Sequence, residues 1–161
     1  SSTLDGIFTL SSKLTIQIKN LTRIDFKKFN NNEVCISGFI YNFIKSNYLR
    51  KNPVLCLVPS EEIKEKISNI LWTQEPASFL PHSTSRTKEL INISDKPEPL
   101  DHSNLLINFN EKSCDWFSRF DSVTEIIISD PTNIKAKQKS YTHYKRFGYE
   151  VAFEDLTVIN S

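Results

Sequence analysis

Residues 53–72 read PVLCLVPSEEIKEKISNILW and contain the pattern that sets the fold class. Residues 54–58 form a short, continuous apolar run after a proline, which is typical of a parallel strand covered on both faces. Ser60 then has the side chain of a helix N-cap, and Glu61 and Glu62 put negative charge in the first turn, where it suits the helix dipole. The stretch therefore predicts a buried strand that leads directly into a helix ending near Trp72. The apolar face of this helix is expected at Ile63, Ile67, Ile70 and Leu71.

Strand and helix patterns alternate along the rest of the chain. Apolar side chains recur at three- and four-residue steps over residues 33–49, which predicts an amphipathic helix. Asp130 and Pro131 form a helix start and Gly148 a natural stop, so we expect a last helix from Pro131 to about Phe147. This order predicts a three-layer α/β/α sandwich around a mainly parallel, Rossmann-like sheet, folded as one domain over residues 1–161. The other expected elements are strands at residues 7–10, 14–18, 90–93, 104–109, 123–128 and 149–153 and a short helical segment at residues 114–120.

Composition excludes several classes of protein. The 161 residues are 39% hydrophobic and 24% charged, which is typical of a globular domain that builds a core without metal or disulfide. The net charge of +1 excludes a polycation that coats nucleic acid. No apolar run approaches the roughly 20 residues of a membrane span, and the three cysteines form no CxxC pair. We therefore expect a soluble protein of the cytoplasm.

Phosphate-binding motifs are missing from the predicted strand ends. A nucleotide cradle needs glycines where the backbone closes on the anion, and no glycine follows a predicted strand. The turn after residues 54–58 instead carries Glu61 and Glu62, which repel phosphate. We therefore expect no nucleotide site and no cofactor. A Rossmann-like nucleotide-using enzyme with an unrecognised loop is the alternative.

Side chains that bind metals or act as nucleophiles are scattered. His82, His102 and His143 lie far apart and do not have the spacing of zinc ligands, so we expect no metal. His82 is more simply interpreted as a solvated or hydrogen-bonded imidazole than as a catalytic one. Cys114 stands beside Trp116 and an adjacent phenylalanine, which favours a packed thiol over a nucleophile.

Basic side chains concentrate on the predicted last helix. Residues 134–147 contain five lysines and arginines and no acid. A solvated surface is the ordinary interpretation of such a run, but the missing acids favour an anionic partner, either phosphate or an acidic peptide. A direct binder of single-stranded nucleic acid is a further alternative. Helical spacing predicts a cationic face at Lys135, Lys139, Thr142 and Arg146 and a core face at Ala136, Ser140, His143, Tyr144 and Phe147.

A separate segment after the second predicted helix contains two aromatic residues and a proline, Trp72, Phe79 and Pro81. They either cover a sheet edge or anchor a partner protein, because aromatic side chains are also typical interface hot spots.

Five short motifs follow one another along the chain. The first is Leu71-Trp72, then seven residues ending in Ser78-Phe79, then Pro81-His82. The others are Leu105-Leu106-Ile107-Asn108, Phe117-Ser118-Arg119-Phe120, a strand from Glu125 leading to Asp130-Pro131, and the spaced Tyr141, Tyr144, Gly148 and Tyr149. In this order and spacing the motifs resemble the chi subunit family of bacterial DNA polymerase III. The resemblance covers roughly residues 33–153, and the first 32 residues match poorly.

The resemblance implies an accessory subunit without an active site. Chi proteins have an α/β fold like that of nucleotide-binding domains but bind no nucleotide. They link the clamp loader, through the psi subunit, to the acidic C-terminal tail of the single-stranded-DNA-binding protein, and they engage a repair helicase alternatively. The resemblance thus implies these protein partners, only weak or indirect DNA contact, no cofactor and no membrane.

The resemblance also implies two interfaces. The psi or helicase interface would contain Trp72, Phe79, Pro81 and His82.

The second interface would bind the acidic tail. An acidic tail that ends in an aromatic residue needs an apolar slot flanked by cations. Family members usually have arginines or other basic residues where this chain has Gln138, Ser140 and Thr142. The tail site would comprise Ile127, Lys135, Gln138, Lys139, Tyr141, Thr142, Lys145 and Arg146.

Overall fold

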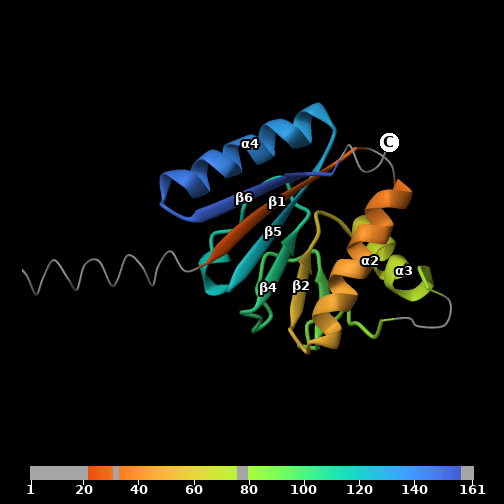
Figure 1. Cartoon of the computed structure of the whole chain (residues 1–161). Coiled ribbons are helices and arrows are strands. Elements are labelled where there is room, and N and C mark those ends of the chain that lie inside the picture. Colours follow the sequence, from red (N-terminus) through yellow and green to blue (C-terminus); the bar gives the residue numbers. More distant parts are fainter. Residues whose placement is uncertain (1–21, 31–32, 76–79, 157–161) are drawn as a thin grey trace, which may run out of the picture.

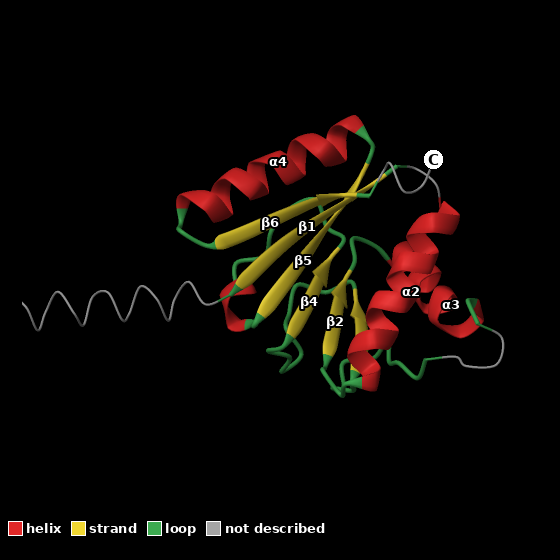
Figure 2. Cartoon of the chain, viewed as in Figure 1, coloured by secondary structure: helices red, strands yellow, loops and turns green. Residues whose placement is uncertain are grey.

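The computed structural model of the chain describes residues 22–30, 33–75 and 80–156. Strands and helices alternate along this part of the chain, and helices cover both faces of one sheet (Figures 1 and 2). The elements are β1 Arg23–Phe29, α2 Glu33–Leu49, β2 Val54–Leu57, α3 Glu61–Thr73, β3 Ile91–Ser94, β4 Leu105–Asn108, the 3₁₀ turn η1 Phe117–Arg119, β5 Ser122–Ile128, α4 Pro131–Arg146 and β6 Glu150–Asp155.

The sheet has six strands in the order β3-β2-β4-β5-β1-β6. Every pairing between neighbouring strands of the described chain is parallel. The chain crosses over β1 when it passes from β5 through α4 to β6, so α4 packs against the half of the sheet that contains β5, β1 and β6. The predicted α/β sandwich with a mainly parallel sheet is confirmed.

The apolar run of β2 is continuous because each of its faces contributes to a different core. Val54 and Cys56 pack with apolar side chains of α2 and α3, whereas Leu55 and Leu57 pack with side chains of α4 and η1. All four are almost fully buried. Burying such a side chain stabilises the fold by about 1.5–3 kcal/mol.

The helix ends follow the predicted capping residues. The Ser60 hydroxyl oxygen accepts a hydrogen bond from the Ile63 amide at 3.3 Å, and an Asp130 carboxylate oxygen accepts one from the Asn133 amide at 3.1 Å. Gly148 has a φ of 82°, a left-handed conformation that glycine adopts without a Cβ penalty. These local signals explain why α3 and α4 lie within one residue of their predicted bounds, and α2 matches its predicted range of 33–49.

β1 is an element that the sequence patterns did not predict. It reads RIDFKKF and lies inside the sheet, between β5 and β6. Ile24 and Phe26 pack under α4, whereas Lys27 on the opposite face forms an ion pair with Glu154 of β6. The charged residues of β1 depart from the continuous apolar run that is typical of a central parallel strand. The strands expected at residues 7–10 and 14–18 lie outside the described residues.

The segment predicted to be helical at residues 114–120 is helical only over Phe117–Arg119, as a single 3₁₀ turn. Phe117 is the buried residue of this turn, and its ring packs edge-on against Tyr144 and Tyr149. The turn therefore closes the α4 side of the core.

Candidate functional site

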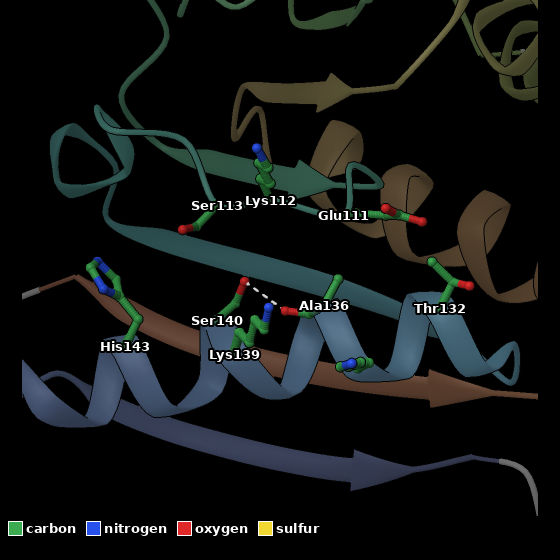
Figure 3. A pocket seen from close by; sticks show the side chains of 9 residues that line it. Glu111, Lys112, Ser113, Thr132, Ala136, Lys139, Ser140 and His143 are labelled. Atoms are coloured by element: carbon green, nitrogen blue, oxygen red, sulfur yellow. Dashed lines mark hydrogen bonds between the residues drawn. The ribbon is translucent and has the colours of Figure 1, made fainter.

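Helix α4 is bordered by two grooves, one along each flank. The first, called here the apolar groove, has a volume of about 610 Å³ and lies between α4 and strands β1, β5 and β6. The second, called the lysine groove, has a volume of about 520 Å³ and lies between α4 and residues 111–113 after β4 (Figure 3). The apolar groove is lined by Phe26, Lys28, Ile127, Ile134, Lys137, Gln138, Tyr141, Thr142 and Phe153. The lysine groove is lined by Glu111, Lys112, Ser113, Thr132, Lys135, Ala136, Lys139, Ser140 and His143.

Aromatic side chains form the apolar groove. The rings of Phe26 and Tyr141 contact each other at a centroid distance of 5.4 Å, and Ile127 lies in the same groove almost buried. Phe153, on edge strand β6, leaves 54% of its surface exposed. The groove is therefore an open slot with apolar walls, of the kind that removes an aromatic ring from water.

Positive charge reaches the apolar groove from a strand as well as from the helix. Lys28 of β1 lines the groove and pairs in register with Ile127 on one side and Asp155 on the other. Lys145 is exposed on α4 and follows Tyr141 by four residues, which places it on the same helix face. Sequence reasoning missed Lys28 because β1 itself was not predicted.

The grooves divide the residues predicted for the tail site. Ile127, Gln138, Tyr141 and Thr142 come together in the apolar groove. Lys135 and Lys139 line the lysine groove on the opposite flank of α4. Lys145 and Arg146 are exposed near the end of α4 and line neither groove.

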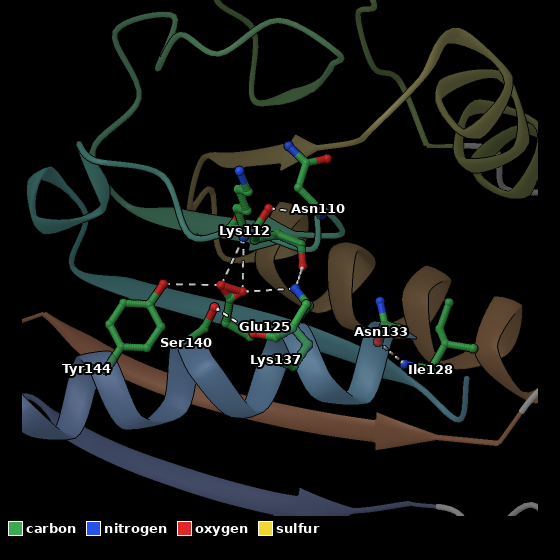
Figure 4. A network of polar contacts seen from close by, with 10 residues as sticks. Asn110, Lys112, Glu125, Ile128, Asn133, Lys137, Ser140 and Tyr144 are labelled. Carbon is green, nitrogen blue, oxygen red and sulfur yellow. Dashed lines mark hydrogen bonds and ion pairs between the residues drawn. The ribbon is translucent and has the colours of Figure 1, made fainter. Parts of the chain in front are cut away.

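A buried ion pair holds α4 against the sheet. Lys137 and Glu125 have fully buried side chains, with Lys137 Nζ 3.1 Å from Glu125 Oε2. Lys137 also donates to the Asn108 carbonyl oxygen at 3.2 Å, and Asn108 Nδ2 donates to both Glu125 oxygens at 2.9 and 3.0 Å. The Tyr144 hydroxyl completes the network (Figure 4) by donating to Glu125 Oε1 at 3.1 Å. Burial and the nearby Glu125 charge raise the pKa of Tyr144, so its hydroxyl stays a donor.

This network corrects the predicted faces of α4. The buried residues of the helix are Lys137, Ser140 and Tyr144, whereas His143 and Phe147 of the predicted core face are exposed. Lys137 points inward because the Glu125 carboxylate lies on β5 beneath it. The surface of α4 therefore carries one cation fewer than its sequence indicates.

The Trp72 region lies on the other face of the sheet, at the end of α3. Trp72 is 53% exposed, and its ring meets that of His82 at 5.8 Å. His82 Nδ1 donates to the Leu80 carbonyl oxygen, so its Nε2 accepts from the Ser68 hydroxyl, both at 2.7 Å. The hydrogen-bonded imidazole is confirmed. Pro81 is exposed, and Phe79 lies outside the described residues.

Cys114 has the environment of a packed thiol. It is partly buried and packs against the core on the α4 side, and burial raises the pKa of its thiol to about 12. Its contact with the core confirms the packed thiol, and a thiol that stays protonated at neutral pH is a poor nucleophile.

The described residues contain no group of three or more His, Cys, Asp and Glu side chains placed to hold a metal ion. Over residues 22–30, 33–75 and 80–156 there is also no helix with the length and apolar character of a membrane span.

His102 is a buried histidine with one unpaired ring nitrogen. Nε2 donates to Asn92 Oδ1 at 2.8 Å, while Nδ1 is buried without a hydrogen-bond partner among the described residues. Burial lowers the pKa of His102 to about 4, below the ordinary value of 6.5. The folded protein therefore binds fewer protons at this site than the unfolded chain between these two pH values.

Acidification is expected to destabilise the protein through His102. The free energy of unfolding has its full value, as far as His102 is concerned, above pH 6.5. It falls by an amount on the order of 3 kcal/mol as the pH is lowered toward about 4. Urea denaturation across this pH range measures it, with His102→Gln as a control that keeps a donor for Asn92. Equal pH slopes for the parent and His102→Gln would contradict the assignment.

Comparison with known proteins gives one family. The family described as DNA polymerase III chi subunit, HolC, matches residues 21–152, which run from β1 into β6 and include every residue that lines the two grooves beside α4 except Phe153. No curated protein matches the chain.

Proposed function

The chain belongs to the DNA polymerase III chi subunit family, and from this we propose that it is a non-catalytic adaptor that links the clamp loader to the single-stranded-DNA-binding protein. Chi subunits are accessory subunits of the polymerase complex, so the chain takes part in DNA replication as an accessory protein. The proposal extends to the cytoplasm as its location and to at most weak contact with DNA.

The apolar groove is the observation that carries the proposal. A peptide that ends in an aromatic residue after several carboxylates needs a slot for its ring and cations for its charges. The ring would lie among Phe26, Tyr141 and Phe153, next to Ile127. These walls and Lys28 at the rim support one docking site.

Polar and charged side chains would complete the tail site. Gln138 and Thr142 line the groove and replace the family's basic residues with neutral hydrogen-bonding groups. Lys28 and Lys145 would then supply the cations that pair with the tail carboxylates. Lys135, Lys139 and Arg146 would attract the acidic tail over a longer range, because they are exposed on α4 without lining this groove.

A second protein partner would dock on the Trp72 region. Trp72, Pro81 and His82 are proposed to contact the psi subunit, and with it the clamp loader, or alternatively a repair helicase. The half-exposed side chain of Trp72 at the end of α3 supports a docking surface, since Trp is enriched among interface hot spots. Phe79 belongs to the proposed interface by its position in the motif.

Nucleotide chemistry has less support. Among the described residues, the turn after β2 presents the exposed carboxylates of Glu61 and Glu62, where a phosphate site would need donors.

Copurification from the native source tests the adaptor. A tagged parent chain is expected to recover both clamp-loader subunits and the single-stranded-DNA-binding protein. Trp72→Ala should lose the first and keep the second, and Tyr141→Ala should do the reverse. Leu49→Ala, which removes an apolar side chain exposed elsewhere, is the control and should recover both. Loss of both partners in either variant, or of neither, would contradict two separate docking surfaces.

A further inference from the structure

The lysine groove is built from two walls that the buried network holds in place. Asn108 Nδ2 donates to the Lys112 carbonyl oxygen at 3.0 Å, and Asn108 Oδ1 accepts from the Asn110 amide at 3.1 Å. The same Asn108 contacts Glu125 and Lys137, which fix the opposite wall, α4 (Figure 4). The backbone that carries Lys112 therefore has a fixed position relative to the backbone that carries the lysines of α4.

Positive charge predominates in this groove. Lys112, Lys135 and Lys139 line it and form no ion pair within the described part of the chain. Elsewhere on the surface Lys45 and Lys64 each pair with a carboxylate. Glu111 is the one acidic residue among those that line the groove, so the lining has a net charge of about +2 with His143 neutral.

The chemistry of the lining selects a polyanion with repeated charges. The three cations of the lining are all lysines, whose ammonium groups act as point charges and commonly bind phosphate. The Ser140 hydroxyl donates to the Ala136 carbonyl (Figure 3), so it gives no proton to a ligand. Lys135 and Lys139 are one helical turn apart, a rise of about 6 Å.

The lysine groove also lacks what the tail peptide needs. Its lining has no Phe, Tyr or Trp, so it offers no slot for a terminal ring. Bases of a nucleic acid would likewise find no stacking platform beyond the His143 imidazole. A ligand held here is bound through its backbone charges alone.

We propose that the lysine groove binds the phosphodiester backbone of single-stranded nucleic acid, without reading its bases. This site is separate from the apolar groove, and it does not depend on the adaptor function. It would place Lys112, Lys135 and Lys139 against successive phosphates of one strand.

Fluorescence anisotropy with a labelled oligothymidylate of about twenty nucleotides tests the proposal on the full chain. Binding is expected at low salt, with a slope of log K against log salt of about −2, since three lysines neutralise about three phosphates. An abasic oligonucleotide of the same length should bind equally well. Lys112→Glu and Lys139→Glu should each weaken binding at least about fivefold.

Lys88→Glu is the matched control, because it makes the same charge change on an exposed residue beside β3, at the opposite edge of the sheet. It should change oligonucleotide affinity less than about twofold. Equal weakening by Lys88→Glu, failure of the abasic strand to bind, or no binding at low salt would overturn the proposal. It would also be overturned if Lys112→Glu abolished binding of an acidic peptide without an aromatic end but spared the oligonucleotide.

These experiments test the two proposed sites independently of each other. Tyr141→Ala should leave oligonucleotide affinity unchanged, and Lys112→Glu should leave the affinity for an acidic peptide with an aromatic end nearly unchanged, because each residue lines a different groove. Loss of oligonucleotide binding in Tyr141→Ala would contradict a separate phosphate site.

Discussion

Replacement of Glu125 by alanine is expected to lower the free energy of unfolding by about 3–5 kcal/mol. The substitution leaves the Lys137 ammonium fully buried without its counter-ion. It also removes the acceptor for the Tyr144 hydroxyl and leaves Asn108 Nδ2 with only the Lys112 carbonyl oxygen among its acceptors in the described chain. Urea denaturation followed by circular dichroism measures the change.

Two further variants separate the ion pair from general effects of substitution on α4 and β5. Glu125→Leu combined with Lys137→Met removes both charges and should be more stable than either single variant, because no buried charge is left unpaired. Lys135→Ala removes an exposed lysine from the same helix and should change stability by less than about 0.5 kcal/mol. A loss below about 1 kcal/mol in Glu125→Ala would contradict the stabilising role of this buried ion pair.

The buried network around Glu125 and Lys137 also connects stability to the grooves. Lys137 lines the apolar groove, and its partner Asn108 holds the loop that carries Lys112. A variant that loosens this network should therefore weaken ligands in both grooves, unlike a substitution that alters one groove lining.

Tyr141→Ala is expected to weaken binding of an acidic peptide with an aromatic C-terminus by about thirtyfold or more, the size of a loss of about 2 kcal/mol. The Tyr141 ring contacts Phe26 and forms a wall of the apolar groove, so alanine opens the slot to water. Titration calorimetry measures the affinity, which should be on the order of micromolar for the parent and weaker as salt rises.

Tyr141→Phe is the matched control for this titration. It keeps the ring and removes only the hydroxyl, so it should retain most of the affinity. Equal heats for the parent and Tyr141→Ala would contradict the placement of the peptide in the apolar groove.

Local signals made the helices predictable from sequence. Capping by Ser60 and Asp130 involves residues three positions apart, and Gly148 ends α4 by its own backbone conformation. The continuous apolar run of β2 likewise reports burial on both faces. Such features need no knowledge of distant parts of the chain.

Long-range partners explain what the sequence patterns missed. Lys137 is indistinguishable from its neighbours on α4 until Glu125, on a different element, is placed beneath it. β1 escaped prediction because charged residues interrupt its apolar pattern, and one of them, Lys27, pairs with Glu154 of β6, more than a hundred residues away. Lys28 and Phe153 join the apolar groove through those two strands. Tyr141 and Ile127 were named as site residues through the family resemblance, and they do line one groove.

The central claim is that an acidic tail with an aromatic end docks in the apolar groove. Titration of the isotopically labelled chain with that peptide, followed by nuclear magnetic resonance, tests it most directly. We expect the largest amide shift changes at Phe26, Ile127, Tyr141 and Phe153, saturating with the calorimetric affinity. Changes centred on Trp72 and His82, or none at saturating peptide, would contradict it.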